Sequence, residues 1–381
     1  MQNSLYACPR CGSTSLRQGD QIIACSNCDR QFPVVLDIID FHDADKDKTA
    51  SLSVGKDRLI AKRLTELFGA ARTFNELHDV YWELFNRYDE GADIEAFDVT
   101  RHLNRDGAPS LMTAEQLSHG RAILEKMPLY LAPTGRELPV DGVALENGCS
   151  LGLWVDGLAA TFRTLIVLDF SLSYLLLVRK IVEERSLSNV YLICGNAERL
   201  PLRTGCIDFV HSNNVIEHVS DQRAMVSESE RVLTEEGMLF IMSPNRFSAY
   251  IEPHFELYGY GFIPEFIRRA HVRRKQNRDI SEVSLLSLGE LRAIIATFFP
   301  DRFQLSFIPR TLRETATGGA IRTGIVKALN SRIGGGAANL LMNRMLLGIM
   351  PYHVAFCFKR QEAGRAQVGT TVAPTAGPAA V

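Results

Sequence analysis

The chain has 381 residues, which is more than a single domain usually contains, so its length predicts two or three structural units. Apolar residues make up 46% and charged residues 23%, a composition typical of soluble globular proteins. The net charge of −2 removes any global argument for binding nucleic acid. With no secretory signal and no run of about 18–20 apolar residues, we expect a cytoplasmic protein without a membrane span.

Two CxxC pairs stand near the start of the chain: Cys8 with Cys11, and Cys25 with Cys28. Two residues between the thiols allow both sulfurs of a pair to face one tetrahedral ion, and two pairs complete a closed site of four cysteines. Such a site has no open position for substrate, so we predict a structural Zn²⁺ in a small ribbon over residues 1–42. The alternatives are chance pairs or a redox motif, but a redox CxxC normally occurs once, at the start of a helix.

Residues 31–40, which follow the second pair, resemble the end of zinc ribbons of the tRNA-methyltransferase-activator type. Those ribbons accompany methyltransferases, either as separate partners or as fused domains. The remaining cysteines lie in apolar segments, where we expect reduced, buried thiols in a reducing compartment. They are Cys149, Cys194, Cys206 and Cys357.

Residues 43–135 are predicted to be a linker followed by helices. The stretch 43–52 is polar and charged, as linkers are. From about 56 to 128, apolar residues recur on one helical face, as Ile60 and Leu64 do.

Between residues 136 and 360, short apolar runs alternate with amphipathic stretches, which indicates an α/β fold of βαβ units around a parallel sheet. A helix is predicted over 288–298, ahead of the last two strands. Residues 361–381 are rich in Ala, Gly, Pro and Thr and are predicted to be disordered. The predicted strands are 142–146, 165–169, 190–194, 207–211, 238–242, 303–308 and 353–358.

A glycine-rich turn follows the first of these strands and contains Glu146, Gly148, Ser150 and Gly152. Such a turn lets the backbone approach a ligand and aims N–H groups at it. Alone it is weak evidence, because many such turns bind nothing and a dehydrogenase also has one. Its place ahead of three further motifs makes the case for a nucleotide site.

The three further motifs follow the next three strands. Asp169 closes the second strand, where a carboxylate can accept both hydroxyls of a ribose. Asn196 and Ala197 follow the third strand, where an amide and the backbone can bond an adenine edge. The segment 208–218 runs from the fourth strand into its loop and contains Asn213. Because ligands bind at the carboxyl ends of parallel strands, we expect all four motifs to form one site.

Through these motifs, residues 120–310 resemble the class I methyltransferases that depend on S-adenosylmethionine (SAM). The resemblance implies a Rossmann-like, seven-stranded sheet with helices on both faces, in a domain of residues 136–360. It also implies which residues surround the cofactor. They are Glu146, Gly148, Ser150 and Gly152 around the methionine part, Asp169 at the ribose, Asn196 and Ala197 at the adenine, and Asn213 beside them.

Two residues depart from the family pattern. Ser150 replaces the middle glycine, so the turn must fit a Cβ near the cofactor. Asn196 replaces the usual aspartate, which keeps an acceptor for the adenine amine but loses its charge. A non-catalytic domain therefore remains an alternative. A dehydrogenase is disfavoured, because it predicts a different layout after the third strand.

The candidate catalytic residues are Asn213, His218 and His254. Methyl transfer from a sulfonium is an in-line displacement, in which positioning supplies much of the rate, and an oxygen or nitrogen acceptor adds the need for a base. The resemblance implies that Glu217 and His218 shape a loop. Related quinone-biosynthesis and small-RNA methyltransferases carry E-x-x-E-H as a metal site, but Asn214 takes the first acidic position here, which disfavours metal-assisted catalysis.

Two insertions, at about 246–285 and 312–351, are expected to cover the substrate face. The first has a basic run over 268–278, which suits either phosphate groups or a solvated helix face. The second is apolar and glycine-rich, and a lid, a homodimer contact, a lipid contact and folded core all remain open for it.

The preferred hypothesis is an O-methyltransferase acting on a saccharide, a lipid-linked glycan or another small metabolite, since residues 243–254 resemble bacterial methyltransferases linked to glycan modification. The alternative is an RNA methyltransferase that uses the ribbon. Against it, the ribbon's cations are Arg10, Arg17 and Arg30, without interleaved aromatic residues. A third hypothesis is a non-catalytic SAM-fold scaffold that binds a partner through the ribbon.

Overall fold

The computed structural model describes residues 5–42, 54–95, 127–248, 251–252, 254–276, 279–306 and 352–359, with a few single residues between these ranges. The predicted linker 43–52, the predicted second insertion 312–351 and the predicted tail 361–381 lie outside the described residues.

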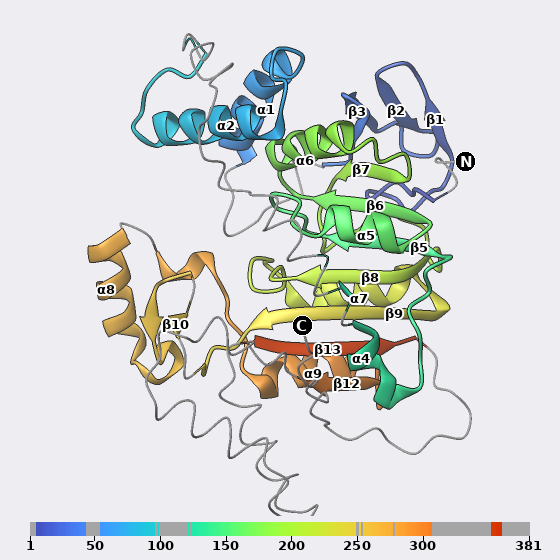
Figure 1. Ribbon diagram of the computed structural model, residues 1–381, viewed down its shortest axis with the longest axis vertical. Helices are drawn as coiled ribbons and strands as arrows, with labels where there is room; N and C mark the ends of the chain where they lie inside the picture. Colours follow the sequence, from blue (N-terminus) through green and yellow to red (C-terminus); the bar gives the residue numbers. More distant parts are fainter. Residues whose placement is uncertain are drawn as a thin grey trace, which may run out of the picture.

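The centre of the molecule is a sheet in which five neighbouring strands run parallel and the two that follow are antiparallel (Figure 1). Its parallel strands are almost entirely buried, because helices cover both faces. These seven strands form the helix-covered sheet that the class I methyltransferase resemblance implies. In spatial order the strands are β7 (Val190–Cys194), β6 (Thr164–Asp169), β5 (Val143–Asn147), β8 (Ile207–Asn213), β9 (Leu233–Pro244), β13 (Tyr352–Phe358) and β12 (Phe303–Ser306).

The N-terminal ribbon extends this sheet at the β7 end. Its last strand, β4, pairs in parallel with β7, and the register places Asp40 opposite Cys194. A separate bridge joins Tyr6 to Leu202. The sheet therefore has eleven strands, and the ribbon is continuous with it. The ribbon strands are β1 (Leu16–Gln18), β2 (Ile22–Cys25), β3 (Gln31–Val35) and β4 (Ile38–Asp40).

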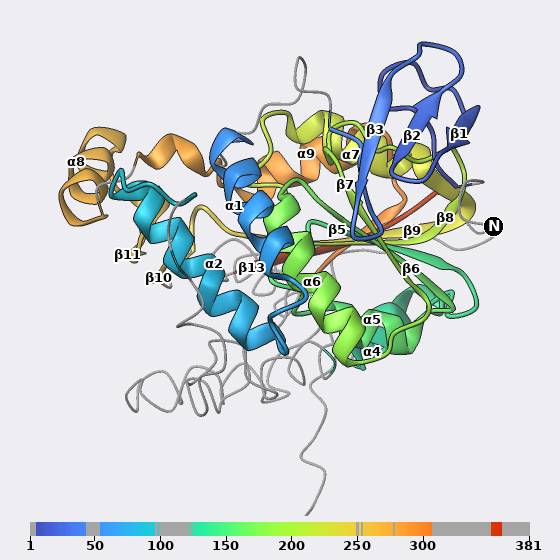
Figure 2. The same ribbon diagram turned by 90° about the horizontal axis from the view of Figure 1, so that it is seen from above.

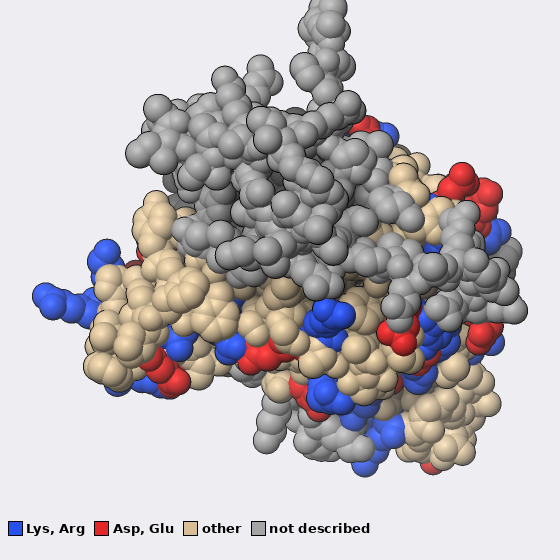
Figure 3. Space-filling view, turned by 90° about the horizontal axis from the view of Figure 1, so that it is seen from below, with Lys and Arg blue, Asp and Glu red and all other residues tan. Residues whose placement is uncertain are grey.

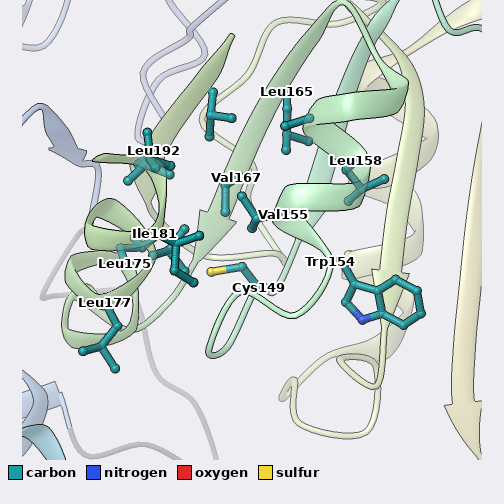
Figure 4. Close-up of a cluster of buried hydrophobic side chains, with 14 of the residues drawn as sticks. Cys149, Trp154, Val155, Leu158, Leu165, Val167, Leu175, Leu177, Ile181 and Leu192 are labelled. Atoms are coloured by element: carbon teal, nitrogen blue, oxygen red, sulfur yellow. The ribbon is translucent and has the colours of Figure 1, made fainter. Parts of the chain in front are cut away.

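Helices form a layer on each face of the sheet (Figure 2). Figure 4 shows part of the hydrophobic core on one face of the sheet, where Leu158 of α5 (Val155–Thr161) and Ile181 of α6 (Leu172–Glu184) lie near Val167 of β6. None of the described helices is long and apolar enough to cross a bilayer. One layer contains α1 (Val54–Leu67), α2 (Phe74–Asp89), α4 (Met127–Leu131), α5 (Val155–Thr161) and α6 (Leu172–Glu184), and the other contains α7 (Gln222–Val232) and α9 (Leu288–Phe298).

A small lobe is inserted between β9 and α9, within the insertion predicted at about 246–285. The arrowheads of β8 and β9 point toward it, so it lies at the carboxyl edge of the sheet (Figure 1). Phe255, Tyr260 and Val272 belong to a buried cluster of its own. Its elements are β10 (Ile251–Glu252), β11 (Leu257–Tyr258), α8 (Glu265–Gln276) and two short 3-10 turns, Tyr260–Phe262 and Ile280–Glu282.

Candidate functional site

The four motifs singled out in the sequence end at the same edge of the sheet. The Gly148 N–H donates to the Leu168 carbonyl at 2.8 Å, and the Gly195 N–H donates to the Asp169 carbonyl at 2.9 Å. On the other side of β5, Glu146 pairs in register with His211 of β8. The glycine turn after β5 therefore lies between the ends of β6 and β8, as the sequence predicts.

The glycine turn needs its glycines for steric reasons. Gly148 and Gly152 have φ angles of 87° and 83°, which side chains rarely adopt. A Cβ at Gly148 would lie 2.4 Å from Cγ2 of Val215, and one at Gly152 would lie 2.9 Å from Cγ2 of Val178. Ser150 also has a left-handed φ, of 46°, but it is exposed. Its Cβ is therefore tolerated with some backbone strain.

Asp169 is held at the centre of this edge by the backbone. Its Oδ2 accepts from the Ser150 N–H at 2.8 Å, and its Oδ1 accepts from the Ser171 N–H at 2.9 Å. Burial raises the pKa of Asp169 to about 6, and the nearby Asp57 carboxylate adds to the shift. Each carboxylate oxygen has further lone pairs, so ribose hydroxyls can donate to it as well.

Asn196 and Ala197 follow β7 and are both buried. Asn196 Oδ1 accepts from the Glu198 N–H at 2.8 Å, so its side chain shapes the turn that carries the adenine motif. Because an Asn fits this role as well as an Asp, the departure from the family pattern leaves the turn intact.

Glu146, at the end of β5, pairs with a histidine of the neighbouring strand. It is fully buried and bonds to Nδ1 of His211. Burial raises the pKa of Glu146, while the imidazole opposes that shift. The structure thus pairs Glu146 with His211, which the sequence motif did not reveal.

Buried polar atoms gather at the ends of β5 and β8. Among the described residues, nineteen buried side-chain N and O atoms have no hydrogen-bond partner, and nine of them belong to residues 146–147 and 211–217. Buried polar groups normally have partners, so this concentration indicates a site for a polar ligand. The nine atoms come from Glu146, Asn147, His211, Ser212, Asn213, Asn214 and Glu217.

The candidate catalytic residues lie beside this site. Asn213 ends β8, and His218 follows in its loop. The ring of His254, from the inserted lobe, lies 5.1 Å from the ring of His218. The structure therefore brings His218 and His254 together, although 36 positions separate them in the chain.

Two carboxylates complete this group: Glu217, a candidate for which the resemblance favours a loop-shaping role, and Glu252. Glu252 Oε1 lies 2.6 Å from Nδ1 of His254, and Glu252 Oε2 accepts from the Phe255 N–H at 2.7 Å. Glu217 is fully buried, and burial raises its pKa to about 8. The spacing Glu-Pro-His in 252–254 was visible in the sequence, but the fold was needed to bring Glu217 close to His254.

The four ribbon cysteines converge as predicted. The Sγ atoms of Cys8 and Cys28 are 3.6 Å apart, and so are those of Cys11 and Cys25. Zinc–sulfur bonds of about 2.3 Å in a tetrahedron place sulfurs about 3.8 Å apart. The donor set and spacing therefore fit one tetrahedral Zn²⁺ with four protein ligands.

Comparison with known proteins identifies the domain that contains the glycine turn. Residues 145–241 match a family described as a methyltransferase domain. A probable SAM-dependent methyltransferase of Mycobacterium tuberculosis is 34% identical over 102 residues, which are 27% of this chain and 35% of that protein. A malonyl-[acyl-carrier protein] O-methyltransferase of a Methylovorus species is 34% identical over 104 residues, 25% of this chain and 34% of that protein.

Both of these relatives are therefore matched over about a third of their length. Among solved structures, phosphoethanolamine N-methyltransferase 2 of Haemonchus contortus with S-adenosylhomocysteine matches with a TM-score of 0.42 and 15% identity, over 62% of this chain and 53% of that one. The matched segment 145–241 spans β5 to β9, which includes the glycine turn, Asp169 and Asn213. Residues 145–241 of this chain therefore form a methyltransferase domain, and this segment is similar to a probable SAM-dependent methyltransferase.

Proposed function

We propose that this chain is an O-methyltransferase that transfers the methyl group of SAM to a hydroxyl of a saccharide, in particular a lipid-linked glycan. The observation that carries the proposal is the position of the inserted lobe. It brings His254 beside His218 at the edge that carries the SAM motifs, and it exposes Phe262 and Phe266 next to cations of α8.

The residues at the carboxyl edge fit SAM. Gly148 lets the backbone pass close to the ligand, Asp169 accepts from the ribose, and Asn213 supplies a buried oxygen that lacks a partner among the described residues. Bound SAM supplies an electrophilic methyl group on a sulfonium. The acceptor oxygen forms a bond to that carbon as the sulfur–carbon bond breaks, and the hydroxyl proton leaves to water.

The acceptor side of the site suits a hydroxyl compound. Asn214 and Ser212 offer buried oxygen atoms that find no partner in the described part of the chain. A saccharide presents several hydroxyl donors to such acceptors. One of the matched relatives is named as an O-methyltransferase, which also favours oxygen as the acceptor atom.

The surface of the inserted lobe suits a lipid with a phosphate head group. Phe262 and Phe266 are 64% and 74% exposed, and Arg273, Arg274 and Lys275 are exposed on the same α8 region. Figure 3 shows this lobe as a broad tan surface with blue side chains along its outer edge. Exposed aromatic residues beside cations are typical of helices that lie at a membrane interface, where the cations attract phosphate.

The position of the ribbon disfavours an RNA acceptor. The hairpin of β1 and β2 lies on the opposite side of the molecule from α8 in both ribbon views (Figures 1 and 2). An RNA enzyme of this design would need a basic surface that joins the two. We infer instead that the ribbon binds Zn²⁺ structurally and supports the sheet edge at β7.

Labelled methyl transfer tests the proposal. The purified full chain is incubated with methyl-labelled SAM and with separate lipid, glycan, RNA and small-molecule fractions of a lysate. Label is expected in the lipid-linked glycan fraction. Label in RNA would overturn the acceptor assignment, and tight SAM binding without transfer to any fraction would favour the scaffold.

A matched pair of variants tests the role of the lobe. Phe266→Ser should lower transfer to a lipid-linked acceptor about tenfold, because a buried Phe contributes roughly 1.5–3 kcal/mol. Leu59→Ser, at an exposed position on α1, is the control and should leave transfer unchanged. Both variants should bind SAM like the wild type, and equal transfer by both would remove the lobe from the acceptor site.

A further inference from the structure

Three potential metal ligands converge beside the acceptor site. The ligand atoms of Glu217, His218 and His254 all lie within 4.8 Å of one another. Glu217 and His218 follow β8, and His254 comes from the inserted lobe, so separate parts of the chain build the group. In sites with metal–ligand bonds of about 2.0–2.2 Å, ligand atoms lie about 3–4 Å apart. A contraction of about 1 Å would therefore bring all three onto one ion.

The buried carboxylate of Glu217 is the second, independent observation. Its side chain is 1% exposed, and neither carboxylate oxygen has a hydrogen-bond partner within the described ranges. A buried, unpaired carboxylate is costly unless an opposite charge or a metal ion compensates it. A divalent cation at the centre of the group would satisfy both oxygens.

Glu252 holds His254 in the orientation that a metal ligand needs. Its Oε1 accepts from Nδ1 of His254 at 2.6 Å, while its Oε2 is fixed by the Phe255 N–H. A proton on Nδ1 leaves the lone pair on Nε2 for a ligand. Metal-binding histidines commonly have such a carboxylate partner, which fixes the tautomer and raises the basicity of the ring.

A second group of candidate ligands shows the contrast. The candidate ligand atoms of Asp40, His42 and Cys194 also lie within 4.8 Å of one another. The guanidinium of Arg58 already donates to Asp40 Oδ1 at 2.9 Å and lies 2.8 Å from Nδ1 of His42. A cation there would face a fixed positive charge, so this second group carries no metal site.

We propose that Glu217, His218 and His254 bind a divalent transition-metal ion, with Glu252 as the positioning residue for His254. Two imidazoles and one carboxylate favour Zn²⁺ or Mn²⁺ over Mg²⁺ and Ca²⁺, which prefer oxygen ligands alone. Three protein ligands leave at least one position open for a further oxygen ligand. Asn214 takes the first acidic position of the E-x-x-E-H pattern, and in this proposal His254 supplies the third ligand instead.

The role of the ion in catalysis rests on the proposed function. A cation at this position would coordinate the acceptor hydroxyl, lower its pKa and hold its oxygen toward the methyl group. His218 and His254 then act as ligands and not as the general base. The ion itself undergoes no redox change, and the proton of the hydroxyl leaves to water.

Manganese binding tests the site without any need for an acceptor. The full chain, with Zn²⁺ already bound by its four ribbon cysteines, is titrated with Mn²⁺ and free Mn²⁺ is followed by electron paramagnetic resonance. Mn²⁺ does not compete for thiolates, so it reports on the nitrogen and oxygen site. One bound Mn²⁺ per chain is expected. Added Zn²⁺ should displace it, while an equal amount of Mg²⁺ should not.

Variants assign the ligands. His254→Ala and Glu217→Gln should each weaken Mn²⁺ binding at least tenfold, and Glu252→Gln should weaken it about tenfold through the orientation of His254. His271→Ala, on α8 and outside the group, is the control and should bind Mn²⁺ like the wild type. Equal binding by His254→Ala and the wild type would overturn the assignment.

The two proposals fail in different ways. A wild-type chain that binds SAM but no Mn²⁺ or second Zn²⁺ would overturn the metal site and leave the methyltransferase proposal standing. A chain that binds Mn²⁺ with these variant effects, yet transfers no methyl group to a glycan, would support the metal site and overturn the proposed acceptor.

Discussion

Ser171 Oγ donates a hydrogen bond of 2.6 Å to Asp57 Oδ1, which joins two residues 114 positions apart in the chain. The Leu172 N–H donates to the other carboxylate oxygen at 3.0 Å, and Ser173 Oγ donates to the Asp57 carbonyl. Asp57 of α1 therefore caps the N-terminus of α6, which begins three positions after Asp169. The N-terminal helices thus support the wall of the cofactor site.

Asp57→Ala is expected to destabilise the protein by about 2 kcal/mol, since it removes a charged acceptor from several donors at a helix N-terminus. Urea unfolding followed by circular dichroism measures the loss. The control is Glu66→Gln, which removes an exposed ion pair with Arg63 on the same helix and should cost less than about 1 kcal/mol. Equal effects of the two substitutions would contradict the capping role of Asp57.

SAM affinity should depend on pH through Asp169. The pKa of Asp169 in the folded protein is about 6, which is above the ordinary value for an aspartate. Folding without SAM therefore disfavours the ionised form of this carboxyl. The protonated carboxyl therefore makes its whole contribution to the free energy of unfolding below about pH 4. This contribution is lost as the pH rises through about 6. Ribose donates to the carboxylate, so binding should be about tenfold weaker at pH 5 than at pH 7.5.

Isothermal titration across this pH range checks the prediction. Asp169→Asn should bind SAM more weakly at neutral pH and show no such dependence, and Asp169→Ala should abolish binding. Glu236→Gln, at an exposed position of β9, is the control and should keep the wild-type profile. Unchanged affinity in Asp169→Ala would remove the ribose assignment.

Ser150→Gly should stabilise the protein by about 0.5 kcal/mol, because glycine adopts the left-handed backbone without strain but loses more entropy on folding. Ser186→Gly is a matched control, since Ser186 has a φ of 51° at the end of α6. Both variants should melt at a slightly higher temperature. SAM affinity should change in Ser150→Gly alone, and a change in both variants would contradict the placement of Ser150 at the cofactor.

Cys25→Ser should loosen the ribbon and the margin of the main sheet together. Because β4 pairs with β7, loss of the metal site is expected to lower hydrogen-exchange protection over residues 5–41 and 190–194. The amides of β5 and β8 should keep their protection. Cys206→Ala, outside the ribbon's cysteine cluster, is the control, and loss confined to residues 5–35 would show that the ribbon folds independently.

Local patterns in the sequence predicted most of the sheet. The apolar run 190–194 coincides with β7, and the helix predicted over 288–298 coincides with α9. The capping box at Ser287 and Glu290 explains why that helix begins where it does. The order of the four motifs predicted the cofactor edge, because parallel strands place their carboxyl ends together.

Contacts between distant segments could not be predicted in this way. Nothing near Asp57 indicates that it caps a helix that begins at Leu172, and nothing near His42 places it beside Cys194. The same holds for the ligand group, since Glu217 and His254 come together only when the inserted lobe folds back onto the loop after β8. Tertiary packing determines these pairs. The local sequence around either residue therefore carries no sign of its partner.

The pairing of β4 with β7 has a consequence for self-association. An unpaired parallel strand presents a row of open backbone N–H and C=O groups, to which another chain can add. Here the ribbon occupies the outer margin of β7 along Ile39 and Asp40. A shortened protein that began after residue 53 would uncover that margin, so it should aggregate even though every cofactor motif remained present.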